Sequence, residues 1–322
     1  MANPSATGAP LPFAHRRARG ADFESLFHYA CMAAATTLLC AMAGVCVLLA
    51  VGGWPAISTF GLGFFTSTVW NPVTDVYGGA GPILGTLITS VIALLLALPL
   101  AFLTAVFLTE FCPHPLRRPI GIAVELLAGI PSIVYGMWGL FVFAPLFATY
   151  VETPLMAGAA PGTIWERLFS GIPNGSGILT ASIILAIMIL PFIAATLREL
   201  FLSIPVRVRE AAYGMGCTPL ETIWSVTLPY VKRSAIGAVM LGLGRALGET
   251  MAVTFVIGNS HHLPRGLFDS GATISSTIAN EFAEATSEMH TSALLALGFV
   301  LFLITFLVLA LARAFLGHGH NA

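Results

Sequence analysis

Six apolar runs, each of more than 20 residues, constrain this chain more than any other feature of its sequence. A helix of about 20 apolar residues is long enough to cross the hydrocarbon core of a bilayer. Backbone in that core must satisfy its own hydrogen bonds, so such runs predict transmembrane helices. The predicted fold class is therefore an all-α polytopic membrane protein with six transmembrane helices, at about 27–51, 83–109, 120–147, 178–200, 235–257 and 292–315.

Composition excludes two other classes of protein. The chain is 57% hydrophobic and 9% charged, with a mean hydropathy of +0.89, which no soluble domain of this length shows. A net charge of −1 argues against nucleic acid as a partner. Lys232, the chain's one lysine, does not follow a glycine-rich loop, so the sequence has no Walker A motif for nucleotide hydrolysis.

The basic residues predict how the chain lies in the membrane. Residues 1–21 are rich in Ala, Pro and Arg and are expected to be a disordered tail, followed by a single transmembrane domain over 22–317. Eleven Lys and Arg residues fall on the side that holds both termini, whereas Arg167 and Arg265 fall on the other. The positive-inside rule then places both termini in the cytoplasm.

A polar segment, 203–234, separates the fourth and fifth predicted spans. Its prolines divide it into two expected short helices, 206–216 and 219–226, with a turn between them. Thr218 is expected to cap the second helix, with Pro219 at its first position. Because such a short helical hairpin has no core of its own, we expect it to lie against another protein.

The same segment resembles the EAA loop of ABC-importer permeases, which has Glu-Ala-Ala, a later Gly and then Leu-Pro at fixed spacing. The resemblance implies the fold of a type I ABC importer permease, in which this loop couples the membrane helices to an ATPase. The residues that match the coupling pattern are Glu210, Ala211, Ala212, Gly216, Leu228 and Pro229.

Two charges interrupt the fifth predicted span, Arg245 and Glu249. A charge at the centre of a membrane helix costs about 2.5–3.5 kcal/mol on insertion scales, so both residues should face protein or water. Either the pair neutralises itself within one continuous helix, or Arg245 lines a path for an oxygen-rich anion and Glu249 holds it in place. Gly244 and Gly248 lie beside them and predict close approach of another helix.

Three further stretches resemble the permease subunits of bacterial phosphate-specific ABC importers: Gly242–Asn259, Asn280–Ala285 and Gly129–Gly136. The resemblance implies that Arg245 and Glu249 serve phosphate passage in the bacterial inner membrane. It also implies a homologous second permease, two ATPase subunits that bind ATP and Mg, and a periplasmic phosphate-binding protein as partners. The chain itself would be no enzyme and hold no cofactor. A permease for another oxyanion and a self-contained ion-coupled anion carrier remain alternatives.

Several other polar residues and the cysteines are expected to have structural roles and not to form a functional site. Glu125 is expected to be a helix-end or interhelical partner, and His261-His262 an ordinary surface pair that lacks further metal ligands. The acidic residues Glu281, Glu284 and Glu288 are expected on one face of an outer helix. The five cysteines show no metal-binding spacing, and disulfides are not expected.

Overall fold

The computed structural model describes residues 14–158, 160 and 162–317, and the chain divides into two compact units, Met1–Val51 and Gly52–Ala322. The first unit is built from the N-terminal part of helix α1 (Ala14–Phe60). Helix at 14–21 corrects the expected disordered tail there, and residues 1–13 lie outside the described residues. Five segments are long and apolar enough to cross a membrane: Ser25–Phe60, Ala80–Phe111, Ser132–Gly158, Ile178–Leu202 and Glu288–Ala314.

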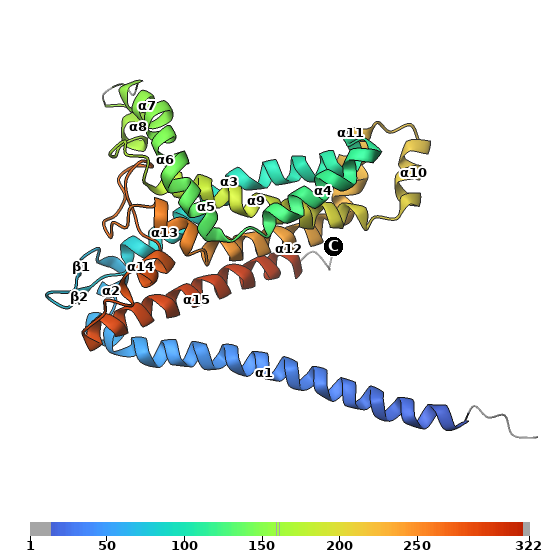
Figure 1. Cartoon of the computed structure of the whole chain (residues 1–322), viewed down its shortest axis with the longest axis horizontal. Helices are drawn as coiled ribbons and strands as arrows, with labels where there is room; N and C mark the ends of the chain where they lie inside the picture. The colour runs from blue at the N-terminus through green and yellow to red at the C-terminus, as the bar shows by residue number, and fades with distance from the viewer. Residues whose placement is uncertain (1–13, 159, 161, 318–322) are drawn as a thin grey trace, which may run out of the picture. The chain divides into compact units, whose positions relative to one another are not determined.

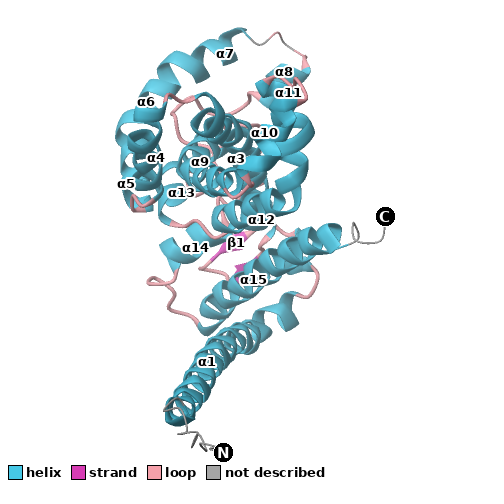
Figure 2. Ribbon diagram, turned by 90° about the vertical axis from the view of Figure 1, so that its right-hand side faces the viewer, coloured by secondary structure: helices cyan, strands magenta, loops and turns pink. Residues whose placement is uncertain are grey.

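Helix α9 (Ile178–Leu202) is the centre of the second unit, and Figure 2 shows other helices around it. In its most apolar stretch 67% of the residues are buried, against 33% or fewer in the other four segments. Helix α3 (Ala80–Val106) packs along α9. The fully buried alanines of α3 recur at four-residue spacing: Ala93, Ala97, Ala101 and Ala105. Such small side chains let two helices approach closely, which drives helix packing in lipid.

The first helix continues through the Gly52–Pro55 stretch, where the sequence predicted its end. A Cβ added to Gly53 would lie 2.7 Å from the backbone of Ala296, in α15 (Glu288–Gly317). The glycines therefore allow close packing against α15 rather than ending the helix. Glycine can either end a helix or allow a second helix to approach closely. Which of the two occurs depends on the neighbouring helix, which the sequence prediction did not include.

The third crossing begins at Ser132, not at residue 120 as predicted. Helix α4 (His114–Ala128) ends before Gly129–Pro131, and a new helical segment starts directly after the proline. A proline disfavours helix in the residue before it, so the chain breaks here. The new segment consists of successive helices and π-helical turns, namely α5 (Ser132–Trp138), η2 (Gly139–Phe143), α6 (Ala144–Phe147), η3 (Ala148–Glu152) and α7 (Thr153–Gly158).

The fifth predicted crossing, 235–257, is not among the five segments that are long and apolar enough to cross a membrane. Two helices stand in its place. They are α12 (Leu228–Leu247) and α13 (Met251–Val256), with an interruption between them. Helix α12 carries Lys232, Arg233 and Arg245, which explains its lower apolarity. The predicted continuous span 235–257 is therefore corrected to a broken one.

Short elements gather at two ends of the second unit, which the long helices connect (Figure 1). One end carries α2 (Gly63–Thr66), α8 (Ile164–Leu168), α14 (Ile274–Glu281) and the antiparallel hairpin of β1 (Trp70–Asn71) and β2 (Val76–Tyr77). The other end carries η1 (Phe107–Phe111), α10 (Val206–Gly214) and α11 (Pro219–Thr222). We call these the hairpin end and the loop end.

Candidate functional site

The break between α12 and α13 is centred on Gly248–Thr250. Glycine is a poor helix former, and Gly248 closes α12 with its N–H bonded to the Gly244 carbonyl at 3.3 Å. Irregular backbone is tolerated at membrane depth only where it is buried in protein or lines a water-filled cavity. The break therefore marks a place that does not face lipid.

Arg245 lies in the last turn of α12, directly before this break. A cation is favoured there because the unpaired carbonyls at a helix C-terminus carry partial negative charge. The guanidinium carbon lies 5.5 Å from the centre of the Phe192 ring of α9, a cation–π arrangement. In the described part of the chain no carboxylate comes within 4.0 Å of Arg245.

Glu249 lies inside the break and turns toward α13, where its Oε1 accepts a hydrogen bond from the backbone N–H of Ala252 at 3.3 Å. The ion pair expected between Arg245 and Glu249 is absent from the described residues. That expectation required residues four apart on one continuous helix, and the helix ends at Leu247. Both residues are half-buried beside the break, but each has a different neighbour.

The glycines near Arg245 act differently from the prediction. A Cβ on Gly242 would lie 2.6 Å from the Ile193 side chain, so Gly242 is the position where α12 meets α9 closely. A Cβ on Gly244 would make only ordinary contacts, at 3.9 Å, with Leu309 of α15. Gly248 ends the helix instead of packing against a neighbour. The close approach therefore occurs at Gly242, two residues before Gly244, and not at the predicted pair Gly244 and Gly248.

The stretch Gly129–Gly136 reaches α13 through α5. A Cβ on Gly136 would come within 2.8 Å of the Phe255 ring and 3.0 Å of the Ala252 Cα atom, both in α13. The Tyr135 hydroxyl donates a hydrogen bond to the Leu127 carbonyl at 3.0 Å. The helical segments that follow the two breaks, α5 and α13, are therefore packed together.

The loop end confirms the predicted local structure of segment 203–234. Helix α10 is followed by Gly216 at φ +89°, a left-handed conformation that glycine adopts without strain. Thr218 and Glu221 form a capping box, with the Thr218 N–H bonded to Glu221 Oε2 at 2.7 Å and the Glu221 N–H bonded to Thr218 Oγ1 at 3.3 Å. Hydrogen bonds from the Thr218 backbone and side chain lower the pKa of Glu221.

One feature of this loop differs from the prediction: α11 does not end near residue 226. It continues through the π-helical turn η4 (Ile223–Thr227) into α12, so Pro229 lies within a continuous helical segment. The π turn widens the helix just before a residue that lacks an N–H. The backbone of α11 is therefore continuous with that of α12, which carries Arg245.

Most of the matched pattern is exposed at the loop end. Glu210, Ala211, Gly216 and Pro229 are exposed and Leu228 is half-buried, whereas Ala212 is 1% exposed. Leu228 and Pro229 line an apolar pocket of about 660 Å³ together with Trp224. The exposed apolar side chains of this end include Val206, Tyr213, Met215, Leu220 and Trp224.

Glu125 is an interhelical partner, as predicted. Its Oε1 accepts from Arg198 Nη1 of α9 at 2.8 Å, which links α4 to α9. Arg198 also contacts the neighbouring Glu199 at 3.1 Å. The Glu125 side chain is 52% exposed, so this ion pair adds little stability on its own.

The hairpin end contains a cluster around Glu281 that the sequence did not reveal. Glu281 accepts from Trp70 Nε1 and lies 3.1 Å from His261 Nε2 and 2.9 Å from His290 Nε2. The Trp70 and His261 rings stack at 5.2 Å, and the Tyr77 and His290 rings stack at 5.1 Å. His261 is therefore no ordinary surface residue. The cluster joins the β hairpin, the loop after α13 and the start of α15.

Burial of the Glu281 carboxylate raises its pKa, but the hydrogen bonds from His261, Trp70 and His290 outweigh burial and leave the pKa lowered. The predicted acidic face is wrong, because Glu281 ends α14, Glu284 lies in the following turn and Glu288 begins α15. In the sequence Glu281 is only an acidic residue near aromatic and histidine-containing stretches. That pattern does not show which of those side chains Glu281 contacts.

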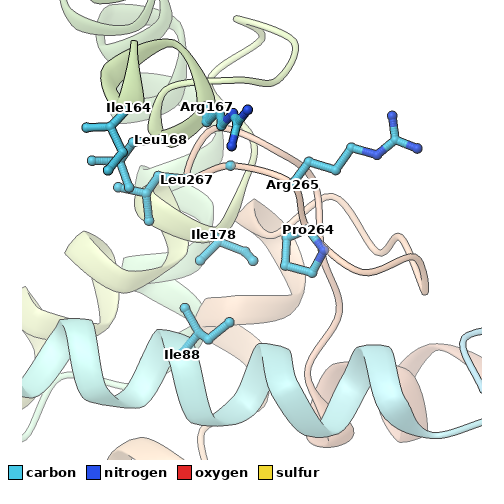
Figure 3. Close-up of a pocket in the computed structure, with 9 residues that line it drawn as sticks. Ile88, Ile164, Arg167, Leu168, Ile178, Pro264, Arg265 and Leu267 are labelled. Atoms are coloured by element: carbon cyan, nitrogen blue, oxygen red, sulfur yellow. The ribbon is translucent and has the colours of Figure 1, made fainter. Parts of the chain in front are cut away.

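Besides the pocket at the loop end, a pocket of about 420 Å³ lies at the hairpin end (Figure 3). Its lining is mainly apolar, with Ile88, Ile178 and Leu267 facing one another. Figure 3 shows the Arg265 side chain extending away from these residues. Arg167 is the other arginine that lines this pocket.

Comparison with known proteins agrees with this geometry. Residues 79–316 match the family model described as binding-protein-dependent transport system inner membrane component. The chain is 54% identical to the phosphate transport system permease protein PstC of Mesorhizobium japonicum, over 90% of this chain and 89% of that protein. It is 50% identical to the protein of the same name from Haemophilus influenzae, over 90% and 92%.

Solved structures share the fold. A bacterial ABC transporter involved in the import of the acidic polysaccharide alginate has a TM-score of 0.57 at 16% identity, over 93% of this chain and 99% of that one. The MetNI methionine ABC transporter in an inward-facing conformation has a TM-score of 0.50 at 19% identity, over 74% and 94%. The chain therefore belongs to the family of binding-protein-dependent transport system inner membrane components, and within it to the PstC permeases.

Proposed function

We propose that this chain is a permease subunit of an ATP-driven importer and that its substrate is inorganic phosphate. Together with a homologous second permease it forms the membrane path, two ATPase subunits supply the energy, and a periplasmic phosphate-binding protein delivers the substrate. Relatives at 50% and 54% identity carry the name phosphate transport system permease, which supports phosphate over another oxyanion.

The observation that carries the proposal is Arg245 at the break between α12 and α13. An arginine at this depth is costly unless water, an anion or a neighbouring subunit satisfies it. Its planar donors suit the oxygens of phosphate, and no described carboxylate lies within 4.0 Å to compete for them. Glu249 beside it keeps the local net charge low, so that the anion passes instead of remaining bound.

The loop end supplies the second part of the proposal. Glu210, Ala211 and Gly216 form an exposed, locally stabilised element with apolar side chains around it, which suits docking on an ATPase subunit. The continuous backbone from α11 into α12 gives a direct mechanical connection to Arg245. In this arrangement both termini and the loop end lie in the cytoplasm, and the hairpin end faces the periplasm.

The direct test is transport by the complete importer in proteoliposomes that enclose ATP and receive the loaded binding protein outside. We expect uptake of radiolabelled phosphate that requires ATP and greatly exceeds uptake of sulfate. Arsenate should compete because it has the same charge and shape as phosphate. Sulfate uptake equal to that of phosphate would favour another oxyanion, and uptake by this chain without ATPase subunits would favour a self-contained carrier.

A further inference from the structure

A single arginine joins the coupling loop to two membrane helices. Arg209 lies in α10, directly before the exposed Glu210. Its Nη1 atom is 3.2 Å from Glu110 Oε1, and its Nη2 atom donates to the Phe201 carbonyl at 2.5 Å. Glu110 belongs to the π-helical turn η1 at the end of α3, and Phe201 belongs to the last turn of α9. We call α3 and α9 the central pair. One side chain therefore contacts α9 and the π-helical turn that continues α3.

The contact is buried, which distinguishes it from an ordinary surface ion pair. The Arg209 side chain is 17% exposed and the Glu110 side chain 8% exposed. Removing two charges from water offsets much of their attraction, so a pair of this kind contributes less to stability than to fixing one geometry. The hydrogen bond to the Phe201 carbonyl also helps to fix the position of Arg209, because a cation is favoured at a helix C-terminus.

The neighbouring residues point to a division of labour within α10. Glu210 and Arg207 are exposed, whereas Arg209 is turned into the bundle. The described ion pairs include Arg209 but not Arg207. Two adjacent residues thus serve opposite sides: Glu210 is available to a docked protein, and Arg209 holds the membrane helices. A displacement of α10 at Glu210 must displace Arg209 as well.

The loop reaches the bundle by a second route, through α11 and η4 into α12. That route is covalent and leads to Arg245. The central pair, α3 and α9, has no such backbone continuity with α11. Helix α9 joins α10 through residues 203–205, Val208 of α10 packs against the apolar core, and Arg209 adds the ion pair between α10 and the end of α3. Without Arg209, motion of the loop would still reach α12 and α9 through the backbone, but the ion pair that ties α10 to the end of α3 would be lost.

We propose that Arg209, through Glu110 and the Phe201 carbonyl, is a positioning residue that makes α3 and α9 move together with the coupling loop. The proposal rests on the proposed function, in which α10 docks on the ATPase. Its role is transmission and not docking: the ATPase should bind and hydrolyse ATP without Arg209, but the hydrolysis should be poorly converted into transport.

The test compares Arg209→Gln and Glu110→Gln with Arg118→Gln, a control at an exposed arginine of α4 outside the docking loop. Each variant is purified as the complete importer and reconstituted, and three quantities are measured: bound ATPase subunits, ATP hydrolysis, and phosphate taken up per ATP hydrolysed. We expect Arg209→Gln and Glu110→Gln to retain the ATPase subunits while uptake per ATP falls by at least about tenfold, within the usual range of coupling between sites. Arg118→Gln should stay near wild type.

A charge exchange, Arg209→Glu with Glu110→Arg, keeps the proposal testable if a single variant folds poorly. It should recover uptake per ATP relative to either Gln variant. Unchanged uptake per ATP in Arg209→Gln would overturn the proposal, and so would loss of the ATPase subunits, since that would assign Arg209 to docking. Failure of the proposed function would appear separately, as a wild-type importer that hydrolyses ATP but moves no phosphate.

Discussion

Arg245 differs from Arg198 and Arg209 in what surrounds it. Arg198 and Arg209 each have a carboxylate, at 2.8 Å and 3.2 Å, near the loop end. Arg245 has an aromatic ring at 5.5 Å and no described carboxylate within 4.0 Å. Sequence alone identified Arg245, because a charge inside an apolar run is costly and visible. Its separation from Glu249 was not visible, since it depends on where the helix breaks.

The Glu281 cluster shows the opposite case at the residue scale. Its partners Trp70, His261 and His290 come from segments far apart in the chain, and no spacing rule brings them together. Only the fold does so, which is why sequence analysis treated His261 and Glu281 as surface residues. The ring stacking and the shared carboxylate connect the β hairpin, the loop after α13 and α15 to one another at the hairpin end.

Glu281→Gln should lower the stability of the hairpin end. The substitution removes charge-assisted hydrogen bonds and should cost about 1–3 kcal/mol at pH 7. Because the folded pKa of Glu281 is lowered from the ordinary value of 4.5, its contribution is full above that pH and is lost as the pH falls through the lower folded value. Thermal unfolding in detergent at pH 7 and near pH 4 measures both effects.

Glu284→Gln is the matched control, because Glu284 is exposed in the adjacent turn. It should unfold at the wild-type temperature at either pH. A Glu281→Gln protein with an unchanged midpoint at pH 7, or with a larger deficit near pH 4 than at pH 7, would contradict the role assigned to the cluster.

At the scale of elements, sequence analysis succeeded where a local rule decides the structure. The turn at Gly216, the capping box of Thr218 and the start of α11 at Pro219 follow from residues a few positions apart. It failed where a glycine has several possible uses. Gly52 and Gly53 pack against α15, Gly242 packs against α9, and Gly248 ends a helix. These differences are set by neighbouring helices, which one sequence does not reveal.

Gly216→Ala should destabilise the loop end, because φ +89° forces an L-residue into a left-handed conformation at a cost of about 1–2 kcal/mol. No heavy atom lies within 4 Å of the added Cβ, so backbone strain is the cause and not crowding. Gly214→Ala is the control: it also adds a Cβ into open space, but at the end of helix α10 and without a positive φ.

We expect Gly216→Ala to reduce co-purification of the ATPase subunits and phosphate uptake, while Gly214→Ala leaves both near wild type or slightly improved. Protein abundance in the membrane, measured by immunoblot, should be similar for the two. Equal behaviour of the two alanine variants would show that the left-handed turn is not needed.

For the whole molecule, the six crossings and their general order were predictable from hydropathy, and the Gly129–Pro131 stretch marked an interruption in the third predicted span, whereas the break between α12 and α13 was not predicted. Apolar runs specify that a segment enters the membrane. They do not specify that the third crossing starts after Pro131 or that α12 and α13 are separate. The segments that follow the two breaks, α5 and α13, pack against each other, and Arg245 ends the helix before the second break.

The orientation predicts accessibility from the two sides of the membrane. In a chain whose five native cysteines are replaced by serine or alanine, Thr218→Cys should react with an impermeant maleimide only after the membrane is permeabilised. Asn174→Cys should react in intact spheroplasts. Reaction of Thr218→Cys from the periplasm would reverse the orientation and remove the basis for coupling to a cytoplasmic ATPase.

The central claim, that phosphate passes at Arg245, is tested most directly by phosphate uptake of the complete importer carrying Arg245→Gln together with Glu249→Gln. The single Arg245→Gln variant should lose uptake by at least about tenfold, the factor given by 1.4 kcal/mol of lost interaction, with its subunits still assembled. If the two charges only neutralised each other, removing both would relieve their burial cost and restore transport. Because the anion needs the arginine, the account predicts that the double variant stays inactive at normal membrane abundance; uptake near the wild-type rate would contradict it.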